Sequence, residues 1–241
     1  MRLNNIPIWC LLLIIATTSC AKIKKPQAEI EHENWISGFS DSIAYYRSLS
    51  ESINTTLEDI NSQISNKLQN FELIKNPREV SGYYLLKGWN KKVPLTSTGL
   101  YVRINENEKL ELIATLAGST FNQIAVKTGG EEYYSEVVPH DQAFNYRHER
   151  YNTVYFSGGK TDTIIECIAA HHFDKVNLEF IEGGKKRNFQ LPEDEKSMVF
   201  QTWDLYDLQN RAHILQKELW INSRKIETFR RMMDRHDKLE Q

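Results

Sequence analysis

One stretch of the chain gathers side chains that are suited to recognition. Residues 139–152 read PHDQAFNYRHERYN, a polar segment rich in aromatic rings. Long loops on a rigid scaffold often carry binding function, and tyrosine with arginine is a frequent recognition pair. We predict a binding loop here, the alternative being a solvated connection whose tyrosines pack back on a sheet. The candidate residues are His140, Asp141, Tyr146, Arg147, Arg150 and Tyr151.

A second candidate is the adjacent pair His171 and His172. Neighbouring side chains of a strand point to opposite faces, so the pair would not chelate one metal unless the strand ends there. Joined with His140 and Asp141, the pair would supply a His/Asp site for a metal and an activated water. That arrangement is the basis of an alternative function as a hydrolase or metal-binding protein. A turn between two strands explains the same residues, so we expect no metal, no cofactor and no catalytic residue.

The sequence contains none of the common catalytic motifs. It has no nucleophile elbow, no Walker loop and no HExxH. The segment SGGK at 157–160 has the letters of a phosphate loop without its spacing, and we expect a hairpin turn there with no helix after it. Cys167 lies within the apolar run 163–170, so we interpret it as a buried thiol that packs like a small hydrophobic residue.

The N-terminus has the order of a secretory signal. The first twenty residues, MRLNNIPIWCLLLIIATTSC, run from a positive charge through an apolar stretch to small residues. The apolar stretch is too short to cross a membrane, which needs ~20 residues. We therefore assign residues 1–19 to a signal peptide and exclude them from the fold.

The residues before Cys20 resemble the lipobox of bacterial lipoproteins. The segment Thr17-Thr18-Ser19-Cys20 departs from that pattern at Thr17, where leucine is usual, and is similar to the relaxed form in Bacteroidetes lipoproteins. The resemblance implies cleavage before Cys20, a lipid on its thiol and attachment to a membrane of the cell envelope. Residues 20–34 would then be the lipidated cysteine and a tether. In the Bacteroidetes group, lipoproteins exported to the cell surface tend to carry an acidic signal just after the cysteine. The basic start of this tether, AKIKK, does not resemble that signal, so we favour the periplasmic side of the outer membrane over the cell surface.

Two long helices are predicted, one on each side of a central region. Apolar residues alternate in steps of three and four over 35–76 and again over 192–238, which is the pattern of a coiled-coil seam. The first helix is acidic and the second is largely basic, so pairing them in one antiparallel coiled coil relieves like-charge repulsion. Ser50 and Asn222 are the polar residues expected to meet in this seam.

The region between the helices, 78–191, changes to a period of two. Short alternating runs separated by paired glycines indicate half-buried strands joined by tight turns. The predicted fold class is therefore α+β. An antiparallel β sandwich or barrel-like head is inserted between the two helices.

These elements suggest a membrane-anchored envelope lipoprotein that binds another molecule. The favoured role is a non-enzymatic binding or adaptor protein whose partner is an envelope protein or a glycan. One alternative is an envelope hydrolase using the histidines above, and another is a structural lipoprotein that forms homo-oligomers through its helices. The formal net charge of −2 gives no basic face for nucleic acid.

Overall fold

The described residues of the chain form three α-helices and two antiparallel sheets. The computed structural model describes residues 27–75 and 81–239, and it describes side chains from 34 to 235 within these ranges. Long helices α1 (Gln27–Leu68) and α3 (Glu193–Leu239) flank a β-rich region that also holds helix α2 (Gly159–Ala170) and the 3-10 turn η1 (Trp89–Lys91). The α+β class is therefore confirmed. The predicted signal peptide and Cys20 lie outside the described residues.

Every strand pair in the two sheets is antiparallel. The first sheet has six strands, in the order β1 (Phe71–Ile74), β2 (Tyr83–Leu86), β3 (Gly99–Asn105), β4 (Leu110–Ala117), β8 (Tyr151–Phe156) and β7 (Asn145–His148). The second has four, in the order β10 (Lys185–Gln190), β9 (Asn177–Glu182), β5 (Gln123–Thr128) and β6 (Glu131–Tyr134). The paired glycines at 129–130 and 183–184 have positive φ and form the β5–β6 and β9–β10 turns.

The two sheets and α2 share one hydrophobic core. Most of the buried strand residues come from β3, β4, β5, β8 and β9. Leu100, Val102 and Ile104 of β3 belong to the same cluster as Ile124 of β5 and Phe180 of β9. Phe121 packs edge-on against Phe180, with ring centroids 4.8 Å apart.

Helix α2 corrects the prediction of a hairpin turn with no following helix at residues 157–160. A helix begins at Gly159, where a hairpin turn without a following helix was expected. Gly158 has φ 107° and ψ 177°, a conformation that only glycine adopts readily, and it turns the chain from β8 into the helix. The apolar run after it buries Ile164, Ile165 and Ile168, a spacing that suits a helix as well as a buried strand.

The first helix starts and ends earlier than its predicted span of 35–76. It begins at Gln27, so residues 27–34 of the predicted tether are helical. It ends at Leu68, and Phe71 then pairs with Leu86 in the six-stranded sheet, which therefore begins before residue 78. Phe71 continues the heptad spacing, but it is buried in the core of the sheets. The observed α3 nearly coincides with the predicted second helix, 192–238.

Helix α3 covers a strand edge that no other strand pairs. Strand β2 pairs with β3 only near residues 104 and 105, which leaves the first half of β3 open. The Leu100 N–H donates to Glu195 Oε2 over 2.9 Å, and the Val102 N–H lies 3.4 Å from Met198 Sδ. A side chain at Gly99 would collide with Glu195. These contacts fix the start of α3 to the six-stranded sheet and protect the edge from pairing with another chain.

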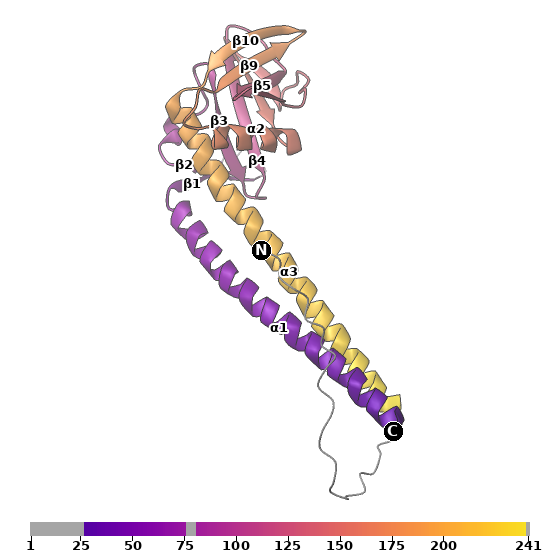
Figure 1. Cartoon of the computed structure of the whole chain (residues 1–241). Coiled ribbons are helices and arrows are strands. Elements are labelled where there is room, and N and C mark those ends of the chain that lie inside the picture. The colour runs from indigo at the N-terminus through magenta and orange to yellow at the C-terminus, as the bar shows by residue number, and fades with distance from the viewer. Residues whose placement is uncertain (1–26, 76–80, 240–241) are drawn as a thin grey trace, which may run out of the picture.

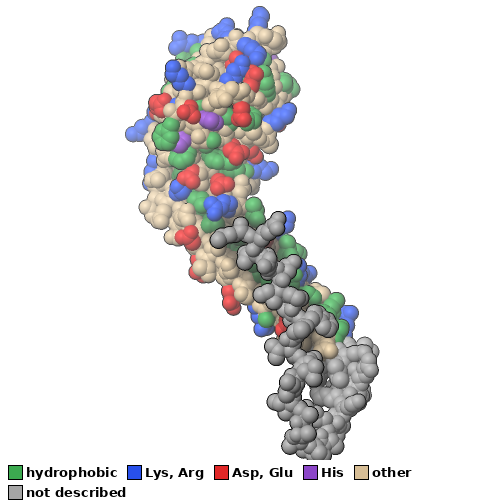
Figure 2. All heavy atoms as spheres, in the orientation of Figure 1, with side chains coloured by type: hydrophobic (Ala, Val, Ile, Leu, Met, Phe, Trp, Pro, Cys, Tyr) green, Lys and Arg blue, Asp and Glu red, His purple; other side chains and the backbone are tan. Residues whose placement is uncertain are grey.

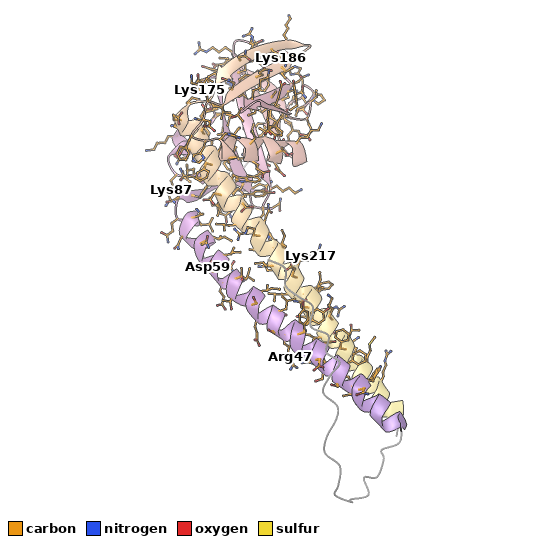
Figure 3. The ribbon with its side chains drawn as sticks, viewed as in Figure 1. Arg47, Asp59, Lys87, Lys175, Lys186 and Lys217 are labelled. Carbon is orange, nitrogen blue, oxygen red and sulfur yellow. The ribbon has the colours of Figure 1, made fainter. Side chains whose placement is uncertain are left out.

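Helices α1 and α3 run side by side in opposite directions beyond the sheets (Figure 1). Phe39 packs against Phe229 with ring centroids 5.5 Å apart, and nearer the head Ile60 packs with Leu208 and Ala212. Lys67 forms an ion pair with Asp204 close to the end of α1. In Figure 3, Arg47 and Asp59 lie on α1 and Lys217 lies on α3, while Lys186 lies among the sheets at the other end of the molecule.

Candidate functional site

A groove lies on the outer face of the six-stranded sheet. The residues that alternate with Leu100, Val102 and Ile104 along β3 are Tyr101, Arg103 and Asn105, so these three share the other face of the sheet. The register then brings neighbouring side chains to the same face, because Tyr83 pairs with Asn105 and Glu111 pairs with Arg103. We call the hollow above them the sheet groove.

Arg103 forms the floor of the sheet groove. Its side chain is 8 % exposed, and its guanidinium lies 4.0 Å from the ring centroid of Tyr83 and 5.4 Å from that of Tyr155. Its Nε donates to Glu111 Oε2 over 2.6 Å, while Asn105 donates to the other carboxylate oxygen over 3.1 Å. Burial raises the pKa of Tyr155 far above its ordinary value, so this hydroxyl stays protonated. The floor is therefore a layer of planar side chains in which the Glu111 carboxylate balances the charge of Arg103.

Phe144 divides the groove into two connected hollows. The larger, of about 590 Å³, is bounded by the floor residues together with Ser81, Gly82 and Ser157. The smaller, of about 300 Å³, extends along residues 136–139. Both volumes fall in the usual range for ligand sites. Phe144 is 59 % exposed and borders both hollows. Its backbone is fixed, because its carbonyl accepts the Tyr155 N–H over 2.8 Å.

Asp141 and His140, predicted as binding residues, hold the loop that carries Phe144. One carboxylate oxygen of Asp141 accepts the N–H groups of Phe144, Ala143 and Asn145, and these hydrogen bonds lower the pKa of the carboxyl. Asp141 also lines the smaller hollow. His140 contacts Glu182 over 2.6 Å on one ring nitrogen and Asn145 over 3.0 Å on the other. The two side chains thus position the loop through these hydrogen bonds.

The remaining predicted residues lie on the β7–β8 hairpin. The stretch predicted as one long loop contains strand β7, and its turn falls at Glu149 and Arg150. Tyr146 stacks on Tyr155 at 6.1 Å and so supports the groove from the side. Arg147 donates to the Glu149 carbonyl, and Arg150 donates to the Tyr151 hydroxyl. These last residues line neither hollow.

The histidine pair lies in the turn that follows α2. His171 contacts Asp174 over 2.9 Å, and His172 stacks on Phe200 at 4.0 Å. The expected turn is present, although a helix precedes it and not a strand. No group of three or more potential metal ligands occurs within the part of the chain that the structure describes. Cys167 is buried in α2, and burial raises the pKa of its thiol to about 11, which disfavours the reactive thiolate.

Sequence reasoning missed the floor of the groove. Arg103 is a single charge within an apolar strand, LYVRIN, and that contrast was the one local signal. Tyr83 and Tyr155 come from β2 and β8, whose places beside β3 and β4 depend on pairing between segments distant in sequence. No local pattern fixes such pairings, so the groove could not be assembled before the fold was known.

Within residues 27–75 and 81–239, no helix is long and apolar enough to cross a membrane.

Comparisons with known proteins give no relative from which a role could be transferred. No protein-family model matches the chain, no curated protein matches it, and no solved structure matches it.

Proposed function

We propose that this chain is a lipid-anchored binding protein of the bacterial cell envelope. A lipid on Cys20 would hold it to a membrane, α1 and α3 would form a stalk, and the β head would bind an envelope protein or a glycan. The observation that carries the proposal is the sheet groove, a preformed hollow with aromatic walls and a floor on which Arg103 is paired with Glu111.

The arrangement of the two long helices supports a stalk. The start of α1 and the end of α3 lie together at the end of the molecule farthest from the sheets (Figure 1). Cys20 precedes the first residue of α1 by seven positions, so a lipid there would sit near that end. The 42 residues of α1 would span about 60 Å along the helix axis. The head would then stand well away from the anchoring membrane.

Contacts between α1 and α3 support an antiparallel coiled coil, with the β head inserted between the two helices in the sequence. Tyr46 stacks on Phe229, and Lys225 lies 4.6 Å from the Tyr46 ring centroid. Ile53 and Ile60, both on the predicted seam, are buried. Alternating apolar contacts of this kind along two helices are typical of a coiled coil.

Metabolic labelling tests the anchor. Cells that process lipoproteins would express the full chain in medium containing an alkyne-tagged palmitate, and the purified protein would be examined for the tag. We expect labelling of the wild type and of Cys167→Ser, whose altered thiol is buried. We expect no labelling of Cys20→Ser, and release of that variant from the membrane fraction. Equal labelling of both variants, or none of the wild type, would contradict the proposal.

A further inference from the structure

We infer that the sheet groove binds an uncharged glycan chain, with sugar rings on both sides of Phe144. This inference rests on the proposed binding function and names the class of ligand. Three features of the groove carry it: its charge, the chemistry of its walls, and its shape.

The charged groups of the groove disfavour ionic ligands. Arg103 is already paired with Glu111, and the Glu111 carboxylate also accepts from Asn105. The remaining acids are Asp141, which accepts three backbone N–H groups, and Glu136, which accepts from Thr161 over 3.5 Å. An anionic polymer would meet these carboxylates. The floor offers a cationic ligand no free carboxylate oxygen, because both oxygens of Glu111 already accept hydrogen bonds. A desolvated charge without a partner is costly, so a neutral ligand fits best.

The walls combine aromatic rings with hydrogen-bonding groups. Tyr83, Tyr155 and Phe144 present apolar rings, and Asn105, Ser81 and Ser157 lie between them. A sugar ring has one face of C–H groups that packs on an aromatic ring and a rim of hydroxyls that donate to amide and carboxylate oxygens. Aromatic walls with a few placed polar groups match both properties of such a ring.

The shape of the groove suits a chain and not one small molecule. The two hollows, of about 590 and 300 Å³, meet at Tyr155, Phe156, Ser157 and Phe144. The exposed Phe144 side chain stands at their junction, where consecutive rings of an oligosaccharide could pack on both of its sides. Figure 2 shows charged side chains of both signs interspersed over the face of the head that it presents.

The test is direct binding by the full mature chain with Cys20→Ser. The probes are chitotetraose, cellotetraose, maltotetraose and mannotetraose, measured by saturation-transfer NMR and titration calorimetry. We expect at least one to bind, and Phe144→Ala to weaken that binding about 10-fold, as loss of an aromatic contact of 1–1.5 kcal/mol implies. Phe144→Trp should retain binding. The matched control is Phe173→Ala, because Phe173 is 88 % exposed and lines neither hollow.

Each other outcome overturns the inference in a distinct way. No binding by the four tetrasaccharides at millimolar concentration rejects an uncharged glycan. Binding that Phe144→Ala leaves unchanged rejects the groove as the site. If a library of peptides binds instead and Phe144→Ala abolishes it, the ligand class is wrong while the proposed binding function stands. Failure of the palmitate experiment would remove the anchor and leave the glycan result unaffected.

Discussion

Glu195 is a buried carboxyl whose protonation is coupled to the docking of α3. Glu195 is 7 % exposed, and its Oε2 accepts the Leu100 N–H at the open edge of β3. Burial raises its pKa to about 7, against an ordinary value of 4.5, although the Leu100 hydrogen bond opposes the shift. The folded chain therefore binds more protons than the unfolded chain between these values. Its contribution to stability is present at low pH and is lost as pH rises through this window.

The expected result is that Glu195→Gln stabilises the protein above pH 7. Glutamine keeps an acceptor for the Leu100 N–H and has no charge to bury. The gain in the free energy of unfolding at pH 8 should be on the order of 1–3 kcal/mol, shrinking towards pH 5. Thermal unfolding at several pH values measures it. Glu58→Gln, at an exposed position of α1, should follow the wild-type profile. A constant difference between wild type and Glu195→Gln from pH 5 to 8 would contradict the coupling.

At the scale of elements, the sequence predicts long regular features better than short ones. The heptad pattern placed α3 within a residue of its observed ends, because apolar steps of three and four that persist over many turns fit a helix and do not fit a strand. The same pattern ran past the end of α1, since Phe71 suits a helix seam and a strand equally well. Helix α2, with 12 residues, was too short to distinguish from a buried strand.

The pairing of α1 with α3 has a polar position that should fix its register. Asn222 is 5 % exposed, and its Nδ2 has no hydrogen-bond partner. Lys67 pairs with Asp204, and Ser50 and Asn222 lie 17 and 18 residues from these two, at matching heights. A buried polar residue at a seam position costs stability and disfavours other registers.

We therefore expect Asn222→Leu to raise the free energy of unfolding by about 1 kcal/mol and to allow α1 and α3 to pair in more than one register. Circular dichroism would measure the first effect. Disulfide trapping between cysteines introduced along α1 and α3 would measure the second, as cross-links at more than one spacing. Ser223→Leu, at the exposed neighbouring position, is the control and should change neither. Lower stability of Asn222→Leu with a single register would contradict this role.

At the scale of the whole molecule, strand β3 and the turn after it contact α3 at two places along the helix. Glu195 binds the first half of β3, and the β3–β4 turn contacts the same helix farther along through Glu108 and His213. The sheet groove includes Asn105, at the end of β3 that leads into this turn. The groove therefore lies towards the part of the sheets that contacts α3 near His213, and a ligand held there would lie on the side of the sheets that faces the two long helices.

An extended shape follows from this arrangement and can be measured by small-angle X-ray scattering of the mature chain with Cys20→Ser. A compact domain of its length would have a radius of gyration of about 17 Å. The helices beyond the head should raise this to on the order of 25–30 Å, with a maximum dimension above the ~70 Å length of α3. A value near 17 Å would mean that the helices fold back on the sheets. The forward scattering gives the mass in the same experiment. A doubled mass would indicate a dimer, for which the exposed side chains Tyr45, Ile214 and Trp220 of α1 and α3 offer an apolar surface.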